Sequence, residues 1–361
     1  MRFLQLPLWI FILSFSFVRG QIPQNYYGGT EDLEGYVLKT ALHQILINSH
    51  NPQAYSSHWS FFESADVLPN GRVWDIYANC NFEFGTPANG GNQDVGTGGN
   101  IECEFFNREH TFPTSWFGGN IEPMRSDVVH IFPADKKVNN ERGNLAFANV
   151  GTVSFLSTNL SKRGNSATNG VTGQVFEIAD EFKGDVARAL FYMATRYEDV
   201  IANWEQNNTD GNKMLNGTSN QVFENWALQL LYDWHINDPV SQKEINRNNA
   251  IMNYQGNRNP FVDFPDWVCQ IWNINDCTLS QPGYEVSTLK LFPNPSTDGI
   301  FTLSGMQATS VVDVYSLQGQ LLQSISTNGT NEVQISLQNK GIYLIRVGST
   351  KGNQMLKAVF Q

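Results

Sequence analysis

Apolar side chains recur every three or four residues in three segments of the chain, 33–48, 181–204 and 220–235. This spacing places them on one face of an α-helix, so the pattern predicts three helices. A fourth helix is predicted over 240–254, where charged residues stand among Ile245, Ile251 and Met252. Candidate N-caps precede the second and third helices or lie at their starts: Asp180, Asp185, Ser219 and Asn220.

Strand patterns are weaker in the body of the chain and dominate its end. Residues 73–77 alternate like a half-buried strand, whereas 86–100 form a Gly/Asn/Thr-rich loop whose length is typical of a surface excursion near a working site. Beyond residue 299, short alternating strands are separated by Gly, Asn and Ser; they are predicted at 299–303, 311–316, 320–324, 332–336, 342–347 and 356–360. The predicted fold class is α+β, with a helix-rich body followed by a small all-β sandwich.

The first twenty residues have the pattern of a secretory signal peptide. Met1-Arg2 gives a positive start, residues 3–18 are largely apolar, and small or tolerable residues precede Gln21. A membrane anchor would need about 20 apolar residues, and this run is shorter. No later segment is long and apolar enough to span a bilayer, so we expect export through the periplasm and no membrane span.

The four cysteines all lie in the part that would be exported. An even number in an oxidising compartment favours two disulfides. Pairing Cys80 with Cys103 and Cys269 with Cys277 closes the two shortest loops, although three connectivities remain open. A zinc site is disfavoured, because the chain has no C-x-x-C pair and no histidine cluster near these cysteines.

Composition permits a packed core, since 41% of the residues are hydrophobic. The formal net charge is −11; the last 77 residues carry +1 and the first 20 carry +2, so the body between them carries −14. Proteins that bind nucleic acid usually present a basic face. The charge balance therefore argues against a nucleic-acid substrate.

Two segments nevertheless carry the groups that phosphodiester hydrolysis requires. Glu109 and His110 are adjacent in the first segment, 107–113, and offer a metal ligand and a general base together. The second segment, 126–144, adds Asn139 and Arg142, which share a face if this stretch is helical. Oxygen ligands favour a hard cation such as Mg²⁺, with Mn²⁺ and Ca²⁺ as alternatives.

Geometry restricts how this pair could work. Neighbours in a regular strand point to opposite faces, so Glu109 and His110 can serve one centre only if the strand ends or twists there. Pro113, just downstream, supports such an end. Taken alone, His110 or His130 is more often a structural histidine than a catalytic one, and the argument rests on the combination.

The combination resembles the endonuclease I family of secreted and periplasmic nucleases, whose ββα-metal core contains an R-E-H segment followed by D-x-H-x-x-x-P-A and V-N-x-x-R-x-N. The resemblance covers roughly 25–275, and the matching core positions are Arg108, Glu109, His110, Asp127, His130, Pro133, Ala134, Val138, Asn139, Arg142 and Asn144. It implies a metal-dependent, non-specific endonuclease acting on DNA, RNA or both.

The resemblance also implies roles for individual residues. Glu109 and Asn139 would be the metal ligands, and His110 would be the general base that activates water. Arg142 would contact phosphate or brace the site, while Asp127 and His130 would orient the core. The arginine at the scissile phosphate falls in a variable stretch, so Arg125 and Arg108 are both candidates.

The C-terminal segment is similar to the sorting domain of type IX secretion substrates, through 291–303, 312–320, 340–347 and the terminal 357–361. The chain is then predicted to consist of a signal peptide (1–20), an endonuclease I-like catalytic domain (21–277), a linker (278–288) and a sorting domain (289–361). We expect a secreted or cell-surface monomer whose partners are nucleic acid and the type IX secretion machinery.

Two other functions are compatible with an exported chain of this kind. The first is a catalytically silent extracellular protein that binds nucleic acid or a surface, against which the intact set of Glu109, His110 and Asn139 argues. The second is a secreted metalloprotease, which requires a motif such as H-E-x-x-H. The sequence runs Glu-His at 109–110 with no second histidine four residues on, so this function is excluded.

Overall fold

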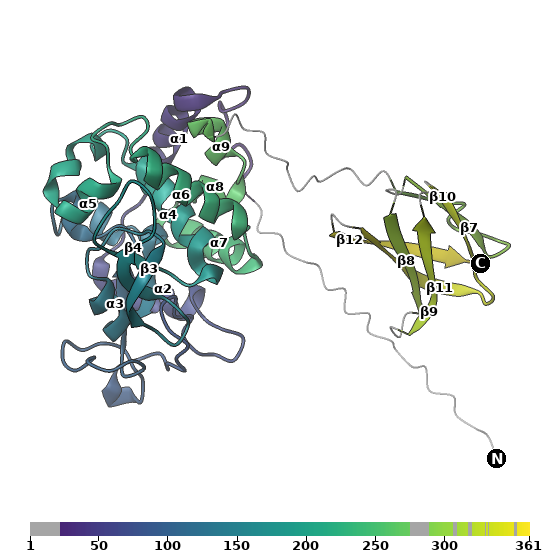
Figure 1. Ribbon diagram of the computed structural model, residues 1–361, viewed down its shortest axis with the longest axis horizontal. Coiled ribbons are helices and arrows are strands. Elements are labelled where there is room, and N and C mark those ends of the chain that lie inside the picture. Colours follow the sequence, from purple (N-terminus) through teal and green to yellow (C-terminus); the bar gives the residue numbers. More distant parts are fainter. Residues whose placement is uncertain are drawn as a thin grey trace, which may run out of the picture. The chain divides into compact units, whose positions relative to one another are not determined.

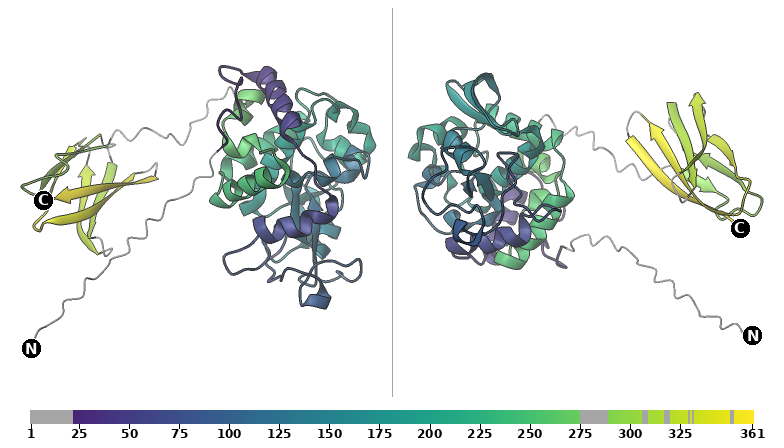
Figure 2. Two further views of the ribbon diagram at one scale, coloured as in Figure 1. Left: turned by 180° about the vertical axis from the view of Figure 1, so that it is seen from behind. Right: turned by 90° about the horizontal axis from the view of Figure 1, so that it is seen from below.

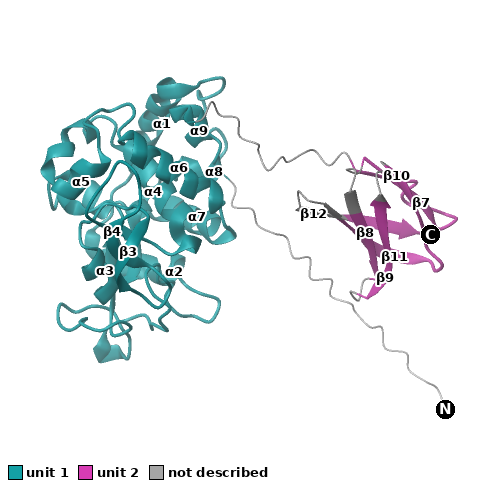
Figure 3. Cartoon of the chain, in the orientation of Figure 1, with its two compact units in different colours: residues 1–277 teal, residues 278–361 magenta. Residues whose placement is uncertain are grey.

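The computed structural model describes residues 22–274 and 289–361, apart from 306–308, 317–319, 329, 331 and 350–351. The chain forms two compact units, residues 1–277 and 278–361 (Figure 3). The predicted signal peptide and the predicted linker lie outside the described residues. Among the helices that the structure describes, none combines the length and the apolar character that a bilayer crossing demands.

Unit 1 is rich in helices and contains two small antiparallel sheets (Figure 1). Its helices are α1 (Gly35–Ser49), α2 (His58–Ala65), α3 (Lys136–Arg142), α4 (Lys183–Arg196), α5 (Thr209–Met214), α6 (Asn225–Asn237), α7 (Gln242–Gln255), α8 (Pro260–Asp263) and α9 (Trp267–Trp272). Its strands are β1 (Phe106–His110), β2 (Ile131–Asp135), β3 (Val150–Leu156), β4 (Lys162–Ser166) and β5 (Gln174–Glu177). The loop-rich segment between α2 and β1 extends from one end of the unit (Figure 2).

Helix α4 forms the centre of unit 1. Nearly all of its residues are buried, and it packs against α1, α6 and α8. A helix that is buried all round belongs to a core rather than to a surface. The helix predicted over 181–204 is therefore confirmed, but it ends at Arg196, because the backbone of Tyr197 leaves the helical conformation. The Tyr197 hydroxyl donates to the Asp127 carboxylate.

Of the predicted helices α4, α6 and α7, only α7 begins with a side-chain cap. Helix α7 begins with a capping box, in which Ser241 accepts from the Glu244 backbone and Glu244 bonds back to the Ser241 backbone. The predicted caps of α4 and α6 are wrong, since Phe182 and Glu224 occupy those positions without a side-chain bond. Helix α6 begins five residues later than predicted, because residue 222 has a left-handed backbone and Phe223 bridges to Leu215.

The strand predicted over 73–77 is wrong. This segment crosses the core as irregular chain, and its backbone N–H groups find scattered partners rather than a neighbouring strand. Val73 donates to the Phe82 carbonyl, Trp74 to that of Asp66, and Ile76 to that of Pro133. Val73, Asp75, Ile76 and Tyr77 are all buried, so the alternation of a half-buried strand is absent, and burial alone does not make a strand.

Unit 2 is a β-sandwich, as predicted. Its strands are β6 (Lys290–Phe292), β7 (Ile300–Ser304), β8 (Thr309–Ser316), β9 (Leu321–Asn328), β10 (Glu332–Ser336), β11 (Gly341–Ser349) and β12 (Gly352–Phe360). They form one sheet in the order β10-β7-β6 and another in the order β12-β11-β8-β9. Alternate residues of both sheets, such as Phe301, Leu303, Val312 and Val314, build one shared core.

The predicted disulfide between Cys80 and Cys103 is present. Cys269 is also disulfide-bonded, and its predicted partner Cys277 lies outside the described residues. The first bridge lies next to the ββα element, because the backbone of Cys103 donates to the Asp135 carboxylate (2.7 Å). The same carboxylate caps the N-terminus of α3 by accepting from Val138 (2.9 Å).

Candidate active site

Strands β1 and β2 and helix α3 form a ββα element. The strands pair antiparallel, with Glu109 opposite Phe132 and His110 opposite Ile131. Helix α3 follows β2 directly, because the Asp135 side chain caps the first turn. Strand β1 ends at His110. An end at this place is what Glu109 and His110 need if both are to serve one centre.

Asn107 and Glu109 alternate on β1 and therefore point to the face that α3 covers. The Asn139 amide nitrogen donates to Asn107 Oδ1 (2.7 Å), and Arg142 Nη1 lies 3.1 Å from Glu109 Oε1. Strand and helix thus bring Glu109, Asn139 and Arg142 to one side of the element. His110, the next residue, contacts a different set of neighbours.

Glu109 is a buried carboxylate with one free oxygen. Its exposed fraction is 2%, and Oε1 receives both the Tyr77 hydroxyl (2.7 Å) and Arg142. Burial raises the pKa of Glu109, while Arg142 and Tyr77 act in the opposite direction. Within the part of the chain that the structure describes, Oε2 accepts no hydrogen bond.

This donor set fits a hard cation. Because the amide nitrogen of Asn139 is committed to Asn107, its oxygen remains without a hydrogen bond from the described residues, as does Glu109 Oε2. A carboxylate oxygen and an amide oxygen are the ligand types that Mg²⁺ takes, with water and phosphate completing its shell. The other candidate cluster in the described residues, Cys80, Cys103 and Asp135, has its sulfur atoms committed to the disulfide.

Arg142 braces the site from within. Its side chain is 1% exposed, and its guanidinium donates to the carbonyls of His110 (3.0 Å) and Thr111 (2.8 Å) as well as pairing with Glu109. These contacts hold the end of β1 against α3. Of the two roles considered for Arg142, its position favours bracing over phosphate contact, since the guanidinium is enclosed by protein.

His110 has a defined proton position. Its Nε2 lies 2.9 Å from the carbonyl oxygen of Arg125, and a carbonyl can only accept, so Nε2 carries the ring proton. In the neutral imidazole, the lone pair then resides on Nδ1. Burial lowers the pKa of His110 well below its ordinary value, and the neighbouring His130 lowers it further, so the ring is neutral at pH 7.

Two arginines lie beside His110 on the ring of Tyr55. The Arg108 guanidinium carbon is 3.7 Å from the ring centroid and that of Arg125 is 4.2 Å, while the Tyr55 ring also stacks on His110. Arg108 has no carboxylate within ion-pair distance among the described residues; Arg125 lies 3.6 Å from the half-exposed Glu122. The site therefore holds local positive charge within an acidic body.

Asp127 and His130 tie the element to the rest of unit 1. The buried Asp127 carboxylate accepts the hydroxyls of Tyr192 (2.7 Å) and Tyr197 (2.9 Å) and the Gln255 amide (2.8 Å). Burial alone would raise the pKa of Asp127, but nearby histidines and these donors lower it overall. His130 Nε2 lies 2.8 Å from the Met124 carbonyl.

Tyr77 and Tyr55 also belong to the site, although no sequence pattern predicted them. Tyr77 lies in the segment taken for a strand, and Tyr55 lies in a 3-10 turn, Tyr55–Ser57, just before α2. Neither belongs to a motif, and an aromatic side chain in an apolar stretch usually indicates core. Only the fold brings their hydroxyl and ring to Glu109 and His110.

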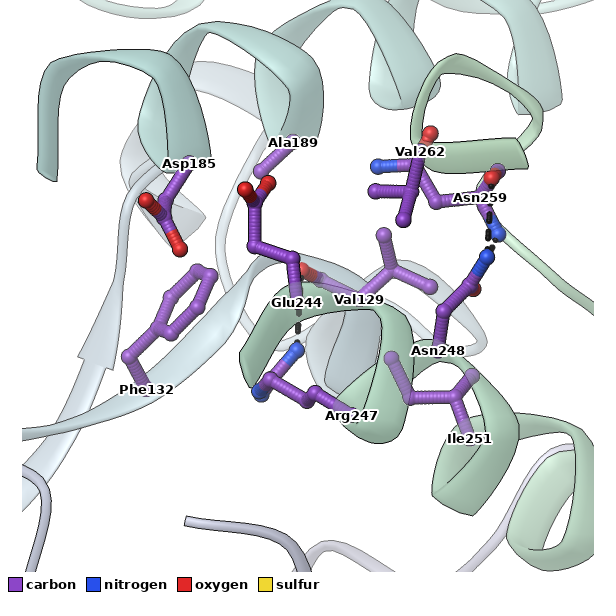
Figure 4. Close-up of a pocket in the computed structure, with 10 residues that line it drawn as sticks. All are labelled: Val129, Phe132, Asp185, Ala189, Glu244, Arg247, Asn248, Ile251, Asn259 and Val262. Atoms are coloured by element: carbon purple, nitrogen blue, oxygen red, sulfur yellow. Dashed lines mark hydrogen bonds between the residues drawn. The ribbon is translucent and has the colours of Figure 1, made fainter. Parts of the chain in front are cut away.

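A separate small cavity lies between β2 and helices α4 and α7 (Figure 4). Its volume of about 20 Å³ has room for a single water. Arg247, on its wall, donates to the carbonyls of Val128 (2.9 Å) and Ile131 (2.6 Å) and so supports the start of β2. None of Glu109, His110 and Asn139 lines this cavity.

Comparison with known proteins gives matches over most of the chain. The Endonuclease I family matches residues 34–266, and the secretion system C-terminal sorting domain matches residues 290–361. Two relatives named "Extracellular ribonuclease", from Bacillus subtilis (strain 168) and Bacillus amyloliquefaciens, are each 36% identical to this chain. These alignments cover 69% of this chain and 78% of each relative.

Among solved structures, PorZ, described as an essential bacterial surface component of the type-IX secretion system of Porphyromonas gingivalis, matches at 22% identity with a TM-score of 0.20. The match spans 23% of this chain and only 12% of that one, which is too little to support a conclusion. The family matches and the two relatives are more extensive. They show that the chain belongs to the endonuclease I family and is a secreted nuclease that carries a C-terminal sorting domain.

Proposed function

We propose that this nuclease hydrolyses phosphodiester bonds with His110 as the general base and with Mg²⁺ held by Glu109 and Asn139. The single observation that carries the proposal is the hydrogen bond from His110 Nε2 to the Arg125 carbonyl (2.9 Å). This bond keeps the ring proton on Nε2 and leaves the Nδ1 lone pair to take a proton from water. Burial lowers the pKa of His110, so the ring is unprotonated at pH 7 and Nδ1 carries a lone pair.

The proposed reaction is a direct attack of water on phosphorus. A water molecule gives one proton to His110 Nδ1, and its oxygen bonds to phosphorus while the bond from phosphorus to the leaving sugar oxygen breaks. The leaving oxygen takes a proton from solvent, and the imidazolium returns its own proton to solvent. Arg108 and Arg125 bind the phosphate oxygens, since guanidinium groups match their geometry. When bound, the cation neutralises charge on the phosphate and on the leaving oxygen.

RNA is the proposed substrate, because both relatives are named as ribonucleases. DNA is tested beside it, since a metal-assisted attack by water needs no ribose 2′-hydroxyl. A catalytically silent protein would bind nucleic acid through Arg108 and Arg125 but would not cleave it. No observation on the site favours that alternative over the nuclease.

The test uses purified protein, total RNA and plasmid DNA, with and without EDTA. EDTA should abolish cleavage. His110→Ala should lower turnover by about 10²–10⁴-fold, as loss of a general base does, at every Mg²⁺ concentration. Glu109→Ala should weaken Mg²⁺ binding, so that part of its activity returns at high Mg²⁺, and Asn139→Ala should behave as a milder version. Asn140→Ala, the exposed neighbour on α3, is the matched control and should cleave normally.

Two results would overturn the assignment. If high Mg²⁺ rescues His110→Ala but not Glu109→Ala, the roles of base and ligand are reversed. If cleavage persists unchanged in EDTA and in all three variants, the chemistry lies elsewhere in the chain.

A further inference from the structure

Three histidines hold one short turn. The turn is the 3-10 segment Met124–Ser126, and its three successive carbonyls each lie within hydrogen-bond distance of a histidine Nε2. His130 contacts the Met124 carbonyl at 2.8 Å, and His110 contacts that of Arg125 at 2.9 Å. His58, the first residue of α2, contacts the Ser126 carbonyl at 3.0 Å. The three side chains come from separate segments and converge on one stretch of backbone.

The proton positions follow from the acceptors. Since a carbonyl only accepts, all three rings carry their proton on Nε2. The Nδ1 atoms of His58 and His130 are buried and have no hydrogen-bond partner in the described part of the chain. An unpaired buried acceptor costs stability, so packing alone does not explain a histidine at position 58. A group that donates at Nε2 is what this position requires.

The turn matters because Arg125 lies at its centre. The Arg125 carbonyl fixes the proton of His110, and the Arg125 guanidinium lies on the ring of Tyr55. His58 contacts both ends of this arrangement: it holds the neighbouring Ser126 carbonyl, and its ring packs edge-on against Tyr55 at 5.0 Å. Its own ring is completely buried, so it does not touch substrate.

We propose that His58 is a positioning residue of the nuclease: its hydrogen bond to Ser126 holds the 124–126 turn so that the Arg125 carbonyl keeps the His110 proton on Nε2. The inference rests on the proposed function in one respect, namely that His110 Nδ1 is the base. Without His58, the turn loses one of its three fixed carbonyls. The proton of the His110 ring can then move to Nδ1. In this tautomer Nδ1 has no lone pair and cannot accept a proton from water. For comparison, loss of a hydrogen bond that orients a metal-ligating side chain typically costs about 10–100-fold in activity.

The test compares three substitutions at position 58. In His58→Gln, the amide nitrogen stands at the same number of bonds from Cα as Nε2 and can still donate to Ser126. In His58→Leu the donor is absent, and in His58→Asn it is one bond too short. His235→Leu is the matched control, because His235 is also buried and also contacts a backbone carbonyl, that of Pro265 (3.1 Å), away from the site.

Two readouts separate positioning from a general structural role. The first is kcat and KM on RNA. The second is the long-range ¹H–¹⁵N spectrum of ¹⁵N-histidine-labelled protein, which distinguishes Nε2–H from Nδ1–H rings. The chain has only six histidines, and the His110 signals are assigned by their loss in His110→Gln. Thermal unfolding of each variant reports its stability.

We expect His58→Leu and His58→Asn to lower kcat about 10–100-fold with little change in KM, and to shift His110 toward the Nδ1–H form. His58→Gln should restore both readouts, and His235→Leu should lower stability without moving either. The inference is overturned if His110 keeps its Nε2 proton in the Leu and Asn variants, or if Gln is no better than Asn. Should His58→Leu fail to fold, the Gln and Asn pair decides the matter.

This design keeps the two proposals apart. The spectrum tests whether His58 fixes the His110 ring, whatever the role of that ring. If His110→Ala cleaves RNA normally, His110 is not the base. In that case His58 cannot change kcat by acting on His110. If His110→Ala is inactive while His58→Leu keeps both readouts unchanged, only the positioning role fails.

Discussion

Replacing Arg142 by methionine tests how the site is built, independently of its chemistry. The guanidinium is 1% exposed, the Glu109 side chain that it pairs with is 3% exposed, and the two lie 3.1 Å apart. Methionine retains much of the apolar volume of arginine, but it leaves the buried Glu109 carboxylate without its positively charged partner. It also removes the donors to the carbonyls of His110 and Thr111. Breaking a buried pair from one side costs about 3–5 kcal/mol.

That loss is large enough to measure by thermal unfolding. For a unit of this size, each kcal/mol lowers Tm by about 2–4 °C, so Arg142→Met should lower the Tm of unit 1 by roughly 6–20 °C. The control is Arg163→Met, which breaks a pair with Glu141 at 2.8 Å where the arginine side chain is 35% exposed. A pair of that kind contributes about 0–1 kcal/mol, and its loss should barely move Tm.

A second substitution tests the cause. Glu109→Gln removes the stranded charge, so the double variant of Glu109 and Arg142 should be more stable than Arg142→Met alone, although Glu109→Gln by itself destabilises. The loss of unfolding free energy in Arg142→Met should also be smaller at low pH. Burial already raises the pKa of Glu109, and at low pH its carboxyl takes a proton and no longer needs the guanidinium. The reasoning is refuted if Arg142→Met unfolds at the wild-type temperature, or if Glu109→Gln brings no recovery.

Three further predictions concern the bridge, the tail and a buried histidine. Removing the Cys80–Cys103 disulfide, which spans 23 residues, by the double substitution Cys80→Ser and Cys103→Ser should lower the unfolding free energy of unit 1 by about 3 kcal/mol in urea titrations; an unchanged midpoint would contradict this. Deleting 286–361 should leave RNA cleavage intact, because unit 2 has its own core, and should retain the protein in the periplasm of its host, as immunoblots of cell fractions would report; normal secretion would refute the sorting role. Burial lowers the pKa of His235 to about 3, so the unfolded chain binds its proton first as pH falls below 6.5, and stability decreases from there toward pH 3. The stability difference between wild type and His235→Gln should therefore narrow from pH 7 to pH 4, and a constant difference in urea titrations would rule this out.

The sequence by itself determined the parts of this protein that depend on neighbours along the chain. Helix α7, the alternating strands of unit 2 and the proximity of Asn139 to Arg142 all follow from local spacing. Loop length favoured the pairing of Cys80 with Cys103 but left three connectivities open, and the structure decides for this one. Local patterns suffice for the helix and for the spacing of Asn139 and Arg142, because the interactions that stabilise these features join residues close in sequence, whereas the pairing of the unit 2 strands joins distant residues such as Tyr343 and Ser316.

Tertiary structure decided everything that depends on which distant groups meet. The apolar pattern of 73–77 is the same for a strand and for an irregular core segment, and only the scattered partners of its backbone decide between them. The hydroxyl of Tyr77 on Glu109, the ring of Tyr55 under two arginines and the contact of His58 with Ser126 join residues 32 to 70 positions apart. No period in the sequence encodes such contacts, because each exists only once the packing of unit 1 has closed the intervening chain.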